Sequence, residues 1–292
     1  MKPAAFEYHD PATLSEVLEL LAEYREDSRA LAGGQSLVPM MNFRLARPAH
    51  LIDLNGVREL RYIRVDGGTL QVGAMTRQRE LERSAPVAEG WPLLTAATSY
   101  IGHVQIRTRG TVGGSLAHAF PSAELPLVMT VLDATLELQS TRAQRSVLAQ
   151  DFFYGCMDTV LEPDELLVAV QVPPMPDESG WAFEEVSRRH GDFALMGVAG
   201  LVSLDAQGCI HEARLGFTEA KPIRPAPAES LLKGARPEDG LFREAAALAV
   251  KELDPDSDIH ASAKYRRHVG EVLARRVLQK AVERAAAVRS ED

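Results

Sequence analysis

Cysteine is nearly absent from this chain. Only Cys156 and Cys209 occur among its 292 residues. Protein-bound iron–sulfur clusters are held by Cys thiolates, and thiolate-rich zinc sites need several Cys residues close together. The chain therefore lacks the ligands for either kind of site, and any redox metal that it works with is expected to belong to another chain.

An excess of basic residues is also lacking. The 32 Lys and Arg residues are outnumbered by 41 Asp and Glu residues, which leaves a formal net charge of −9 at pH 7. A protein that binds the nucleic-acid backbone needs concentrated positive charge to neutralise the phosphates. We therefore expect no nucleic-acid partner.

Long apolar runs are missing as well. Segments such as ELPLVMTVLDATLEL are broken by acidic residues and proline before they reach the roughly 20 residues that a membrane-spanning helix needs. The N-terminal segment MKPAAFEYHD has no apolar core behind Lys2, so it does not resemble a secretory signal. We expect a cytoplasmic protein without a transmembrane segment, which meets a membrane only through partners.

What the chain does contain indicates an α+β protein. A length of 292 residues allows two domains. The segment TLSEVLELLAEY begins with Thr13 and has Glu16 three positions later, the spacing of a capping box, and its apolar residues recur at helical spacing. Strands are expected in HLIDL, from His50 to Leu54, and in a hairpin that turns at Asp66-Gly67-Gly68.

The segment PPMPDESG, from Pro173 to Gly180, has the Pro, Gly and acidic content of a linker. The sequence after it reads as a group of strands followed by a group of helices, not as alternating strands and helices. We therefore predict a domain boundary in this segment, with domains at 1–176 and 177–292.

Two stretches place adjacent glycines beside hydroxyl or amide side chains. They are AGGQS, from Ala32 to Ser36, and TVGGS, from Thr111 to Ser115, and a short extended segment is expected to lead into each. Paired glycines let backbone N–H groups converge on an anion without obstruction by a Cβ, and hydroxyl groups add donors. Tight turns are the alternative, since turn formation is the default use of glycine. The residues alone leave both a pair of turns and a nucleotide-diphosphate site open.

Other sequence motifs do not identify a further cofactor, metal site or catalytic residue. Neither glycine stretch fits a P-loop or the GxGxxG dinucleotide fingerprint, which disfavours a nucleoside triphosphatase or a nicotinamide Rossmann enzyme. His103 and His118 have no Cys or acidic residue at ligand spacing, so no metal ligands are assigned. Arg107 and Arg109 either offset diphosphate charge or form ordinary surface ion pairs. Because no hydrolase motif is present, no catalytic residues are assigned.

Four segments together resemble the FAD-binding medium subunit of molybdenum hydroxylases, the family of the aerobic carbon monoxide dehydrogenase medium chain and the xanthine dehydrogenase FAD subunit. The segments are LAGGQSLVPMMNFRLARPAHLIDL, QIRTRGTVGGSLAHAFPSAELPLVMTVLDA, RRHGDFALMGVA and DIHASAKYRRHVGEVLARRVLQKA. The resemblance extends from near Phe6 to about Ala286. It implies a vanillyl-alcohol-oxidase type FAD domain with subdomains at about 1–55 and 56–176, followed by a smaller C-terminal domain with an antiparallel sheet and helices.

The resemblance also implies which residues contact FAD. The family loops A-G-G-[HQ]-S and T-[IV]-G-G-[NS] match the two glycine stretches, and both are expected to meet the pyrophosphate and ribitol through backbone N–H groups and the hydroxyls of Ser36 and Thr111. The full set of expected FAD contacts is Ala32, Gly33, Gly34, Gln35, Ser36, Leu37, Thr111, Val112, Gly113, Gly114, Ser115, Glu124, Leu166 and Phe193.

Three of these residues have their own expected roles. Glu124 corresponds to an acid that makes a polar contact near the adenosine half, and Leu166 to an apolar contact with the flavin. Phe193 corresponds to the aromatic residue of the family motif G-D-[YF]-A, which can reach back from the C-terminal domain to cover the ring. The sequence departs from the family at Phe120, where many relatives have Asp, and at His103-Val104, where Asp-Pro is commoner. Phe193 also lacks the hydroxyl of the commoner Tyr.

By resemblance, the chain is expected to bind FAD and to serve as the electron-exit subunit of a heterotrimeric molybdenum hydroxylase. A large subunit with a molybdenum cofactor would hydroxylate the substrate, a small subunit with two [2Fe-2S] clusters would pass the electrons on, and two heterotrimers would form a dimer. Two alternatives stay open: a self-contained flavin oxidase of the same wider fold, and a non-catalytic docking subunit. The substrate, whether carbon monoxide, a purine, an N-heterocycle or an aldehyde, and the electron acceptor are not readable from this chain.

Overall fold

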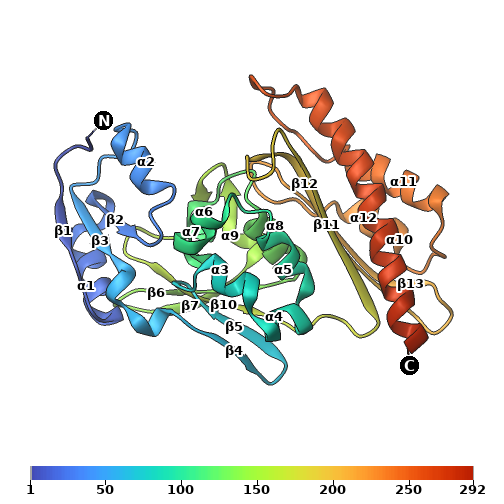
Figure 1. Cartoon of the computed structure of the whole chain (residues 1–292), viewed down its shortest axis with the longest axis horizontal. Coiled ribbons are helices and arrows are strands. Elements are labelled where there is room, and N and C mark those ends of the chain that lie inside the picture. Colours follow the sequence, from blue (N-terminus) through green and yellow to red (C-terminus); the bar gives the residue numbers. More distant parts are fainter. Residues whose placement is uncertain (1, 292) are drawn as a thin grey trace.

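The structure, a computed structural model, describes residues 2–291. Its three main sheets follow one another along the molecule, from the N-terminal end to the long C-terminal helix (Figure 1). Helices occupy the space between the second and third sheets. Within the described residues, no helix is both long enough and apolar enough to cross a bilayer.

The first sheet is small and parallel. Its strand order is β1-β3-β2, formed by β1 (Glu7–His9), β3 (His50–Asp53) and β2 (Ser28–Leu31). Helix α1 (Leu14–Tyr24) covers one face, and its apolar residues share a core cluster with Ile52. The predicted capping box at Thr13 and Glu16 is present and starts this helix. The short helix α2 (Leu37–Asn42) follows β2.

The second sheet is antiparallel, with strand order β4-β5-β10-β6-β7. Strands β4 (Ile63–Asp66) and β5 (Thr69–Gly73) form the predicted hairpin, whose turn residues Gly67 and Gly68 have φ of 55° and 80°. Six helices follow the hairpin and lie in the centre of Figure 1. The remaining elements of this part are α3 (Gln78–Arg83), α4 (Ala85–Gly90), α5 (Pro92–Thr98), α6 (Val104–Arg109), α7 (Val112–His118), α8 (Glu124–Val131), β6 (Thr135–Gln139), β7 (Gln144–Leu148), α9 (Ala149–Phe152), β8 (Phe153–Gly155), β9 (Asp158–Thr159) and β10 (Leu166–Val172).

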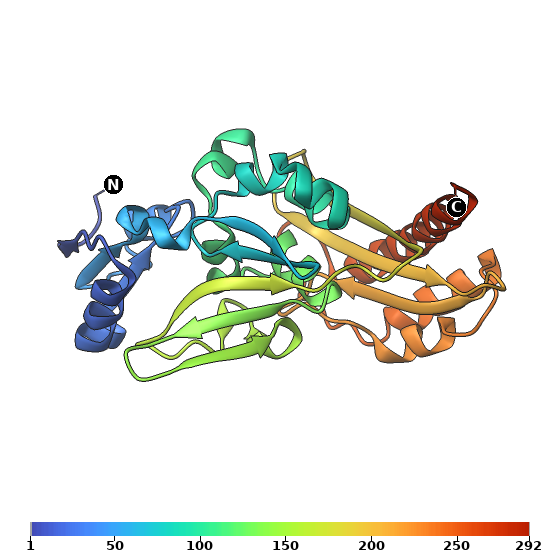
Figure 2. The same ribbon diagram turned by 90° about the horizontal axis from the view of Figure 1, so that it is seen from below.

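The third sheet joins the two halves of the molecule. Strands β11 (Ser179–Ser187), β12 (Ala194–Leu204) and β13 (Ile210–Phe217) are antiparallel and are seen side by side in Figure 2. Because side chains alternate along a strand, β12 buries both faces. Ala199 and Leu201 join the central core with the helices of the second part, whereas Val198 and Val202 join the C-terminal core.

The C-terminal core is closed by helices α10 (Ala226–Leu232), α11 (Asp239–Ala249) and α12 (Ala263–Glu291). Strands followed by helices were predicted for this region, and the structure has that order. The predicted boundary between 176 and 177 lies in the connection from β10 to β11. The subdomain boundary near residue 55 lies between the first and second sheets.

The second glycine stretch differs from the prediction. An extended segment was expected to lead into it, but helix α6 does so, and only Gly110 and Thr111 are extended. Gly113 and Gly114 lie in the first turn of α7, where the Thr111 side chain accepts a hydrogen bond from the amide of Gly114 at 3.0 Å. A Gly pair is a poor helix former by propensity, which is why the sequence favoured a loop. The Thr111 cap and the packing around the pair override that preference.

The contact between β11 and α12 depends on one bare backbone position. A Cβ at Gly180 would collide with the carbonyl oxygen of Ala281 and the amide nitrogen of Ala285 in α12. We expect Gly180→Ala to lower the free energy of unfolding by about 1–3 kcal/mol or more, because the helix must move away from the strand. Urea unfolding of the full chain measures this. The control is Gly155→Ala, where a Cβ meets no heavy atom within 4 Å, and equal midpoints for the two variants would contradict the prediction.

Candidate cofactor-binding site

The two glycine stretches, far apart in the sequence, touch one another in the fold. A Cβ at Gly33 would lie 2.8 Å from the Cα of Gly110 and would also collide with the carbonyl oxygen of Arg109. On the other side of the contact, a Cβ at Gly114 would lie 3.4 Å from the Cβ of Ala32. The absence of a Cβ at Gly33 therefore allows the first loop to lie against the backbone of the second segment.

A polar bridge of two side chains holds the loops together. The Asn55 amide donates to the carbonyl oxygen of Ala32 at 3.1 Å, and Arg77 donates to the Asn55 side-chain oxygen at 2.6 Å. Arg77 also donates to the carbonyl oxygen of Arg109. Partial burial lowers the pKa of Arg77, and the nearby Arg61 and Arg109 add to this shift. Sequence reasoning missed Asn55 and Arg77, because nothing in their local sequence distinguishes them from surface residues.

The first loop offers free backbone donors. Among the described residues, no acceptor pairs with the amides of Gly33, Gly34, Gln35 or Ser36. The Gln35 side chain donates back to the carbonyl oxygen of Gly33 at 3.0 Å, which closes the loop on itself. Gly34 has φ of 71°, in the left-handed region that favours glycine. Successive unpaired amides of this kind form an anion-binding nest.

The second stretch differs, because the amides of its last four residues, Val112 to Ser115, are already hydrogen-bonded within the protein. Val112 donates to the carbonyl oxygen of Thr76 at 3.0 Å, and Gly113 to that of Ala74 at 2.8 Å. Gly114 and Ser115 donate to the side-chain and backbone oxygens of Thr111, at 3.0 and 3.2 Å. The backbone donors of an anion site are thus concentrated in the first loop. The contribution expected from the hydroxyl groups of Thr111 and Ser115 stays a prediction.

Phe193 reaches the end of α7 from the connection between β11 and β12. Its ring centroid lies 4.4 Å from that of Phe120, and its side chain is 69% exposed. In the same connection, a Cβ at Gly191 would lie 2.6 Å from the ring of His103. Two of the departures from the family pattern, His103 and Phe120, therefore contact the C-terminal part on either side of the second glycine stretch.

Glu124 and Leu166 are both buried. Glu124 begins α8, and desolvation raises its pKa to about 7, partly offset by Arg107. The neighbouring charge of Glu124 adds to the desolvation that raises the pKa of Glu185, on β11, to about 8. Leu166 begins β10 and packs in the core beneath α1. The expected contacts of Glu124 and Leu166 with FAD stay predictions.

The structure separates the two arginines considered for diphosphate binding. Arg107 is buried, forms an ion pair with Glu82 at 2.9 Å and donates to the carbonyl oxygens of Ile101 and Gly102. Arg107 therefore stabilises the region around α6. Arg109 is exposed beside the first loop, so only Arg109 remains available to a diphosphate.

The side chains that could hold a metal ion lie away from the second glycine stretch. Among the described residues, neither His103 nor His118 belongs to a group of three possible ligands, whereas Glu7, His9 and His50 form such a group. Sequence reasoning missed this group because β-sheet pairing brings His50 to the other two residues. No local spacing pattern indicates it.

Comparison with known proteins identifies the two parts of the chain. Residues 4–175 match the model of the FAD binding domain in molybdopterin dehydrogenase, and residues 181–281 match that of the CO dehydrogenase flavoprotein C-terminal domain. The chain is 42% identical to 6-hydroxypseudooxynicotine dehydrogenase complex subunit alpha of Paenarthrobacter nicotinovorans, over 98% of this chain and 97% of that protein. It is 36% identical to the carbon monoxide dehydrogenase medium chain of Hydrogenophaga pseudoflava, over 98% and 100%.

Solved structures agree with these matches. A chain of carbon monoxide dehydrogenase from Hydrogenophaga pseudoflava superposes with a TM-score of 0.95 at 36% identity, covering 97% of this chain and 99% of that chain. A chain of quinoline 2-oxidoreductase from Pseudomonas putida 86 gives a TM-score of 0.93 at 39% identity, covering 98% and 99%.

Buried Glu124 and half-buried Glu185 make stability depend on pH. Their pKa values are raised from 4.5 to about 7 and about 8, so the folded protein holds protons that the unfolded chain has released. The stabilisation linked to these protons is fully present below pH 4.5 and is lost as the pH rises to about 8. Replacing Glu185 by Gln removes the buried charge. At each pH the unfolding temperature of the unmodified protein is subtracted from that of Glu185→Gln. We expect this difference to be larger at pH 8.5 than at pH 5.

Thermal unfolding at several pH values measures this effect. Glu89→Gln is the control, because Glu89 is exposed on α4, and its midpoint relative to the unmodified protein should not change with pH. Parallel pH profiles for Glu185→Gln and the unmodified protein would contradict the assignment.

Proposed function

Because this chain belongs to the family of FAD-binding medium subunits of molybdenum hydroxylases, we propose that it carries electrons between the iron–sulfur clusters of a partner subunit and an external acceptor. The chain is an FAD-binding oxidoreductase subunit. Its proposed partners are a large subunit with the molybdenum cofactor and a small [2Fe-2S] subunit, assembled as a dimer of heterotrimers. The proposed location is the cytoplasm.

The observation that carries this proposal is the contact between the two glycine stretches. The loop with the unpaired amides of residues 33–36 lies against the backbone of Arg109 and Gly110, and the proposed site adds the hydroxyl groups of Thr111 and Ser115 to these donors. This donor set suits a diphosphate, since an anion nest needs several convergent N–H groups. Phe193 stands exposed nearby and is the residue proposed to lie against the flavin ring. When bound, FAD supplies the redox chemistry, while the protein supplies position and electrostatics.

The distribution of cysteine supports partner subunits as the source of single electrons. Cys156 is exposed beside β8, whereas Cys209 lies between β12 and β13 in the C-terminal part. Two thiols in different parts of the chain cannot hold an iron–sulfur cluster. The clusters of the proposed electron path therefore belong to another chain.

Substrate choice is also proposed to lie in a partner. Proteins named for a nicotine-derived heterocycle, for carbon monoxide and for quinoline have similar identities to this chain, 42%, 36% and 39%. Carbon monoxide shares no recognition chemistry with the two N-heterocycles, and binding sites for a diatomic gas and for an aromatic ring would differ in shape and polarity. A subunit that resembles all three over nearly its whole length is suited to a step that they share, the exit of electrons.

Flavin binding tests the role of the two stretches. We expect Gly34→Val and Gly114→Val each to abolish FAD binding. A β-branched residue is strained at φ of 71°, and a Cβ at Gly114 would lie 2.7 Å from the Thr111 hydroxyl. The ratio of flavin absorbance to protein absorbance after purification measures occupancy, and circular dichroism confirms folding. Gly155→Val is the control, because that position is open. Full occupancy in either loop variant would refute its assignment.

Electron flow is tested by comparing the chain alone with the assembled complex. In the complex co-purified from its native source, addition of the substrate should bleach the flavin absorbance. The isolated chain loaded with FAD should not respond to aldehydes, purines, N-heterocycles or carbon monoxide. Bleaching of the isolated chain by one of these compounds would contradict the proposal and favour a self-contained oxidase. Failure of the folded chain to bind flavin would favour a docking subunit.

A further inference from the structure

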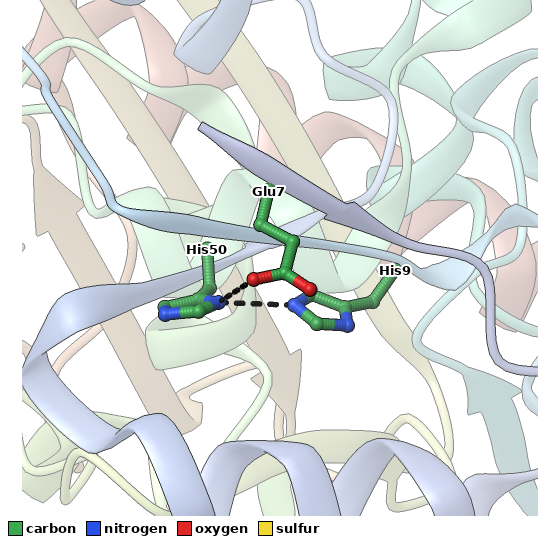
Figure 3. Close-up of side chains that lie close together, drawn as sticks. All are labelled: Glu7, His9 and His50. Carbon is green, nitrogen blue, oxygen red and sulfur yellow. Dashed lines mark hydrogen bonds and ion pairs between the residues drawn. The ribbon is translucent and has the colours of Figure 1, made fainter. Parts of the chain in front are cut away.

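Three possible metal ligands meet at the edge of the first sheet. Glu7 and His9 are two positions apart in β1, so their side chains point to the same face of the sheet. The parallel register pairs Glu7 with His50 at the start of β3, and His9 with Ile52. Ile52 is covered by α1, so this is the face that the helix partly shields. Figure 3 shows the three side chains turned toward one another.

The distances between the three ligand atoms suit an ion with tetrahedral coordination. His9 Nε2 lies 3.1 Å from His50 Nδ1, and His50 Nδ1 lies 3.6 Å from Glu7 Oε2. All three ligand atoms are within 4.8 Å of one another. Zinc bonds to nitrogen and oxygen are about 2.0–2.2 Å, so two ligands of a tetrahedral ion lie about 3.3 Å apart. An ion can therefore contact all three atoms with only small side-chain movements.

Without an ion the group has more acceptors than protons. In a pair of neutral imidazoles that face one another, one ring nitrogen donates and the other accepts. The Glu7 carboxylate only accepts, yet it faces the same His50 nitrogen that faces His9 (Figure 3). A single proton cannot satisfy both contacts of that nitrogen well. A cation accepts a lone pair from each of the three side chains.

Tyr24 orients the rings from the end of α1. Its ring stacks on His50 with a centroid distance of 3.7 Å and an interplanar angle of 5°, and on His9 at 5.1 Å. Residues that fix the orientation of ligating imidazoles contribute to metal affinity. The two histidines are thus held in position by packing that does not depend on the ion.

The surroundings are acidic. An open groove beside His9 is lined by four carboxylates, those of Asp10, Glu16, Glu19 and Glu23. Glu7 is 66% exposed and His50 20% exposed at the side chain, so the group is open to the solvent. A cation can enter from this side, and a coordination position remains for water.

We propose that Glu7 Oε2, His9 Nε2 and His50 Nδ1 bind one divalent ion of the zinc class. Two imidazoles with one carboxylate suit zinc better than magnesium or calcium, which prefer oxygen ligands. The ion ties β1 to β3. Since β1 has three residues and pairs only with β3, a metal link holds the edge strand of the FAD-binding part in place. This site is separate from the glycine loops and does not depend on the proposed electron-transfer role.

Zinc binding by the purified full chain tests the proposal. After treatment with a chelator, titration with zinc chloride against a chromophoric competitor should show one equivalent bound. His50→Phe keeps a ring to stack on Tyr24 but removes the ligating nitrogen, and Glu7→Gln keeps an exposed polar side chain of the same shape. Each variant should weaken binding by more than the roughly 10-fold to 100-fold that loss of an outer-shell partner costs.

Two controls separate this site from other zinc ligands. His211 is exposed on β13, so His211→Phe should bind zinc as the unmodified chain does. The double variant Cys156→Ser/Cys209→Ser should also retain binding, because thiolates are not involved. Zinc should raise the unfolding temperature of the unmodified chain and leave that of His50→Phe unchanged, since only ligand bound to the folded state stabilises it. The proposal is overturned if the unmodified chain binds no stoichiometric zinc, or if the folded His50→Phe and Glu7→Gln variants bind it equally well.

Discussion

The close approach of two backbone segments organises the cofactor-binding part of this protein. Gly33 has no Cβ, so the loop after β2 can lie directly against the backbone of Arg109 and Gly110. Asn55 and Arg77 then bridge the carbonyl groups of both segments. The amides of residues 33–36 are unpaired in this arrangement, whereas those of residues 112–115 donate to the carbonyl oxygens of residues 74 and 76 and to Thr111. Any larger residue at Gly33 would push the two segments apart.

The third sheet fixes the position of Phe193. Strand β12 is buried on both faces, one in the central core and the other against α12. Its position fixes the connection that precedes it, which places Phe193 against Phe120 and Gly191 against His103. The buried carboxyls of Glu124 and Glu185 lie where the central and C-terminal parts meet, and their raised pKa values reflect the loss of solvent there. The packing of the two parts therefore sets both the reach of the aromatic side chain and the electrostatics behind it.

Several predictions from the sequence are confirmed. The family membership indicated by the four quoted segments is confirmed by the family models and the full-length relatives, and the capping box at Thr13 and the hairpin at Gly67-Gly68 are present. These features depend on neighbouring residues or on long matching segments, which a sequence displays directly. The helix around Gly113 was not predicted, because the helix propensity of a Gly pair is low and its packing against Ala74 depends on β5.

Composition and local pattern determined that two cysteines are too few for an iron–sulfur cluster, and the resemblance of long segments indicated the family and the two candidate FAD loops. Only the tertiary structure decided which backbone amides have no hydrogen-bond partner and that Arg107 forms an ion pair with Glu82. It also decided that the side chains of Glu7, His9 and His50 lie close together. The physical reason is the same in each case. A hydrogen-bond partner, a desolvated charge or a convergent set of ligands is defined by distance in space, and strand pairing and helix packing bring together residues whose separation along the chain carries no signal.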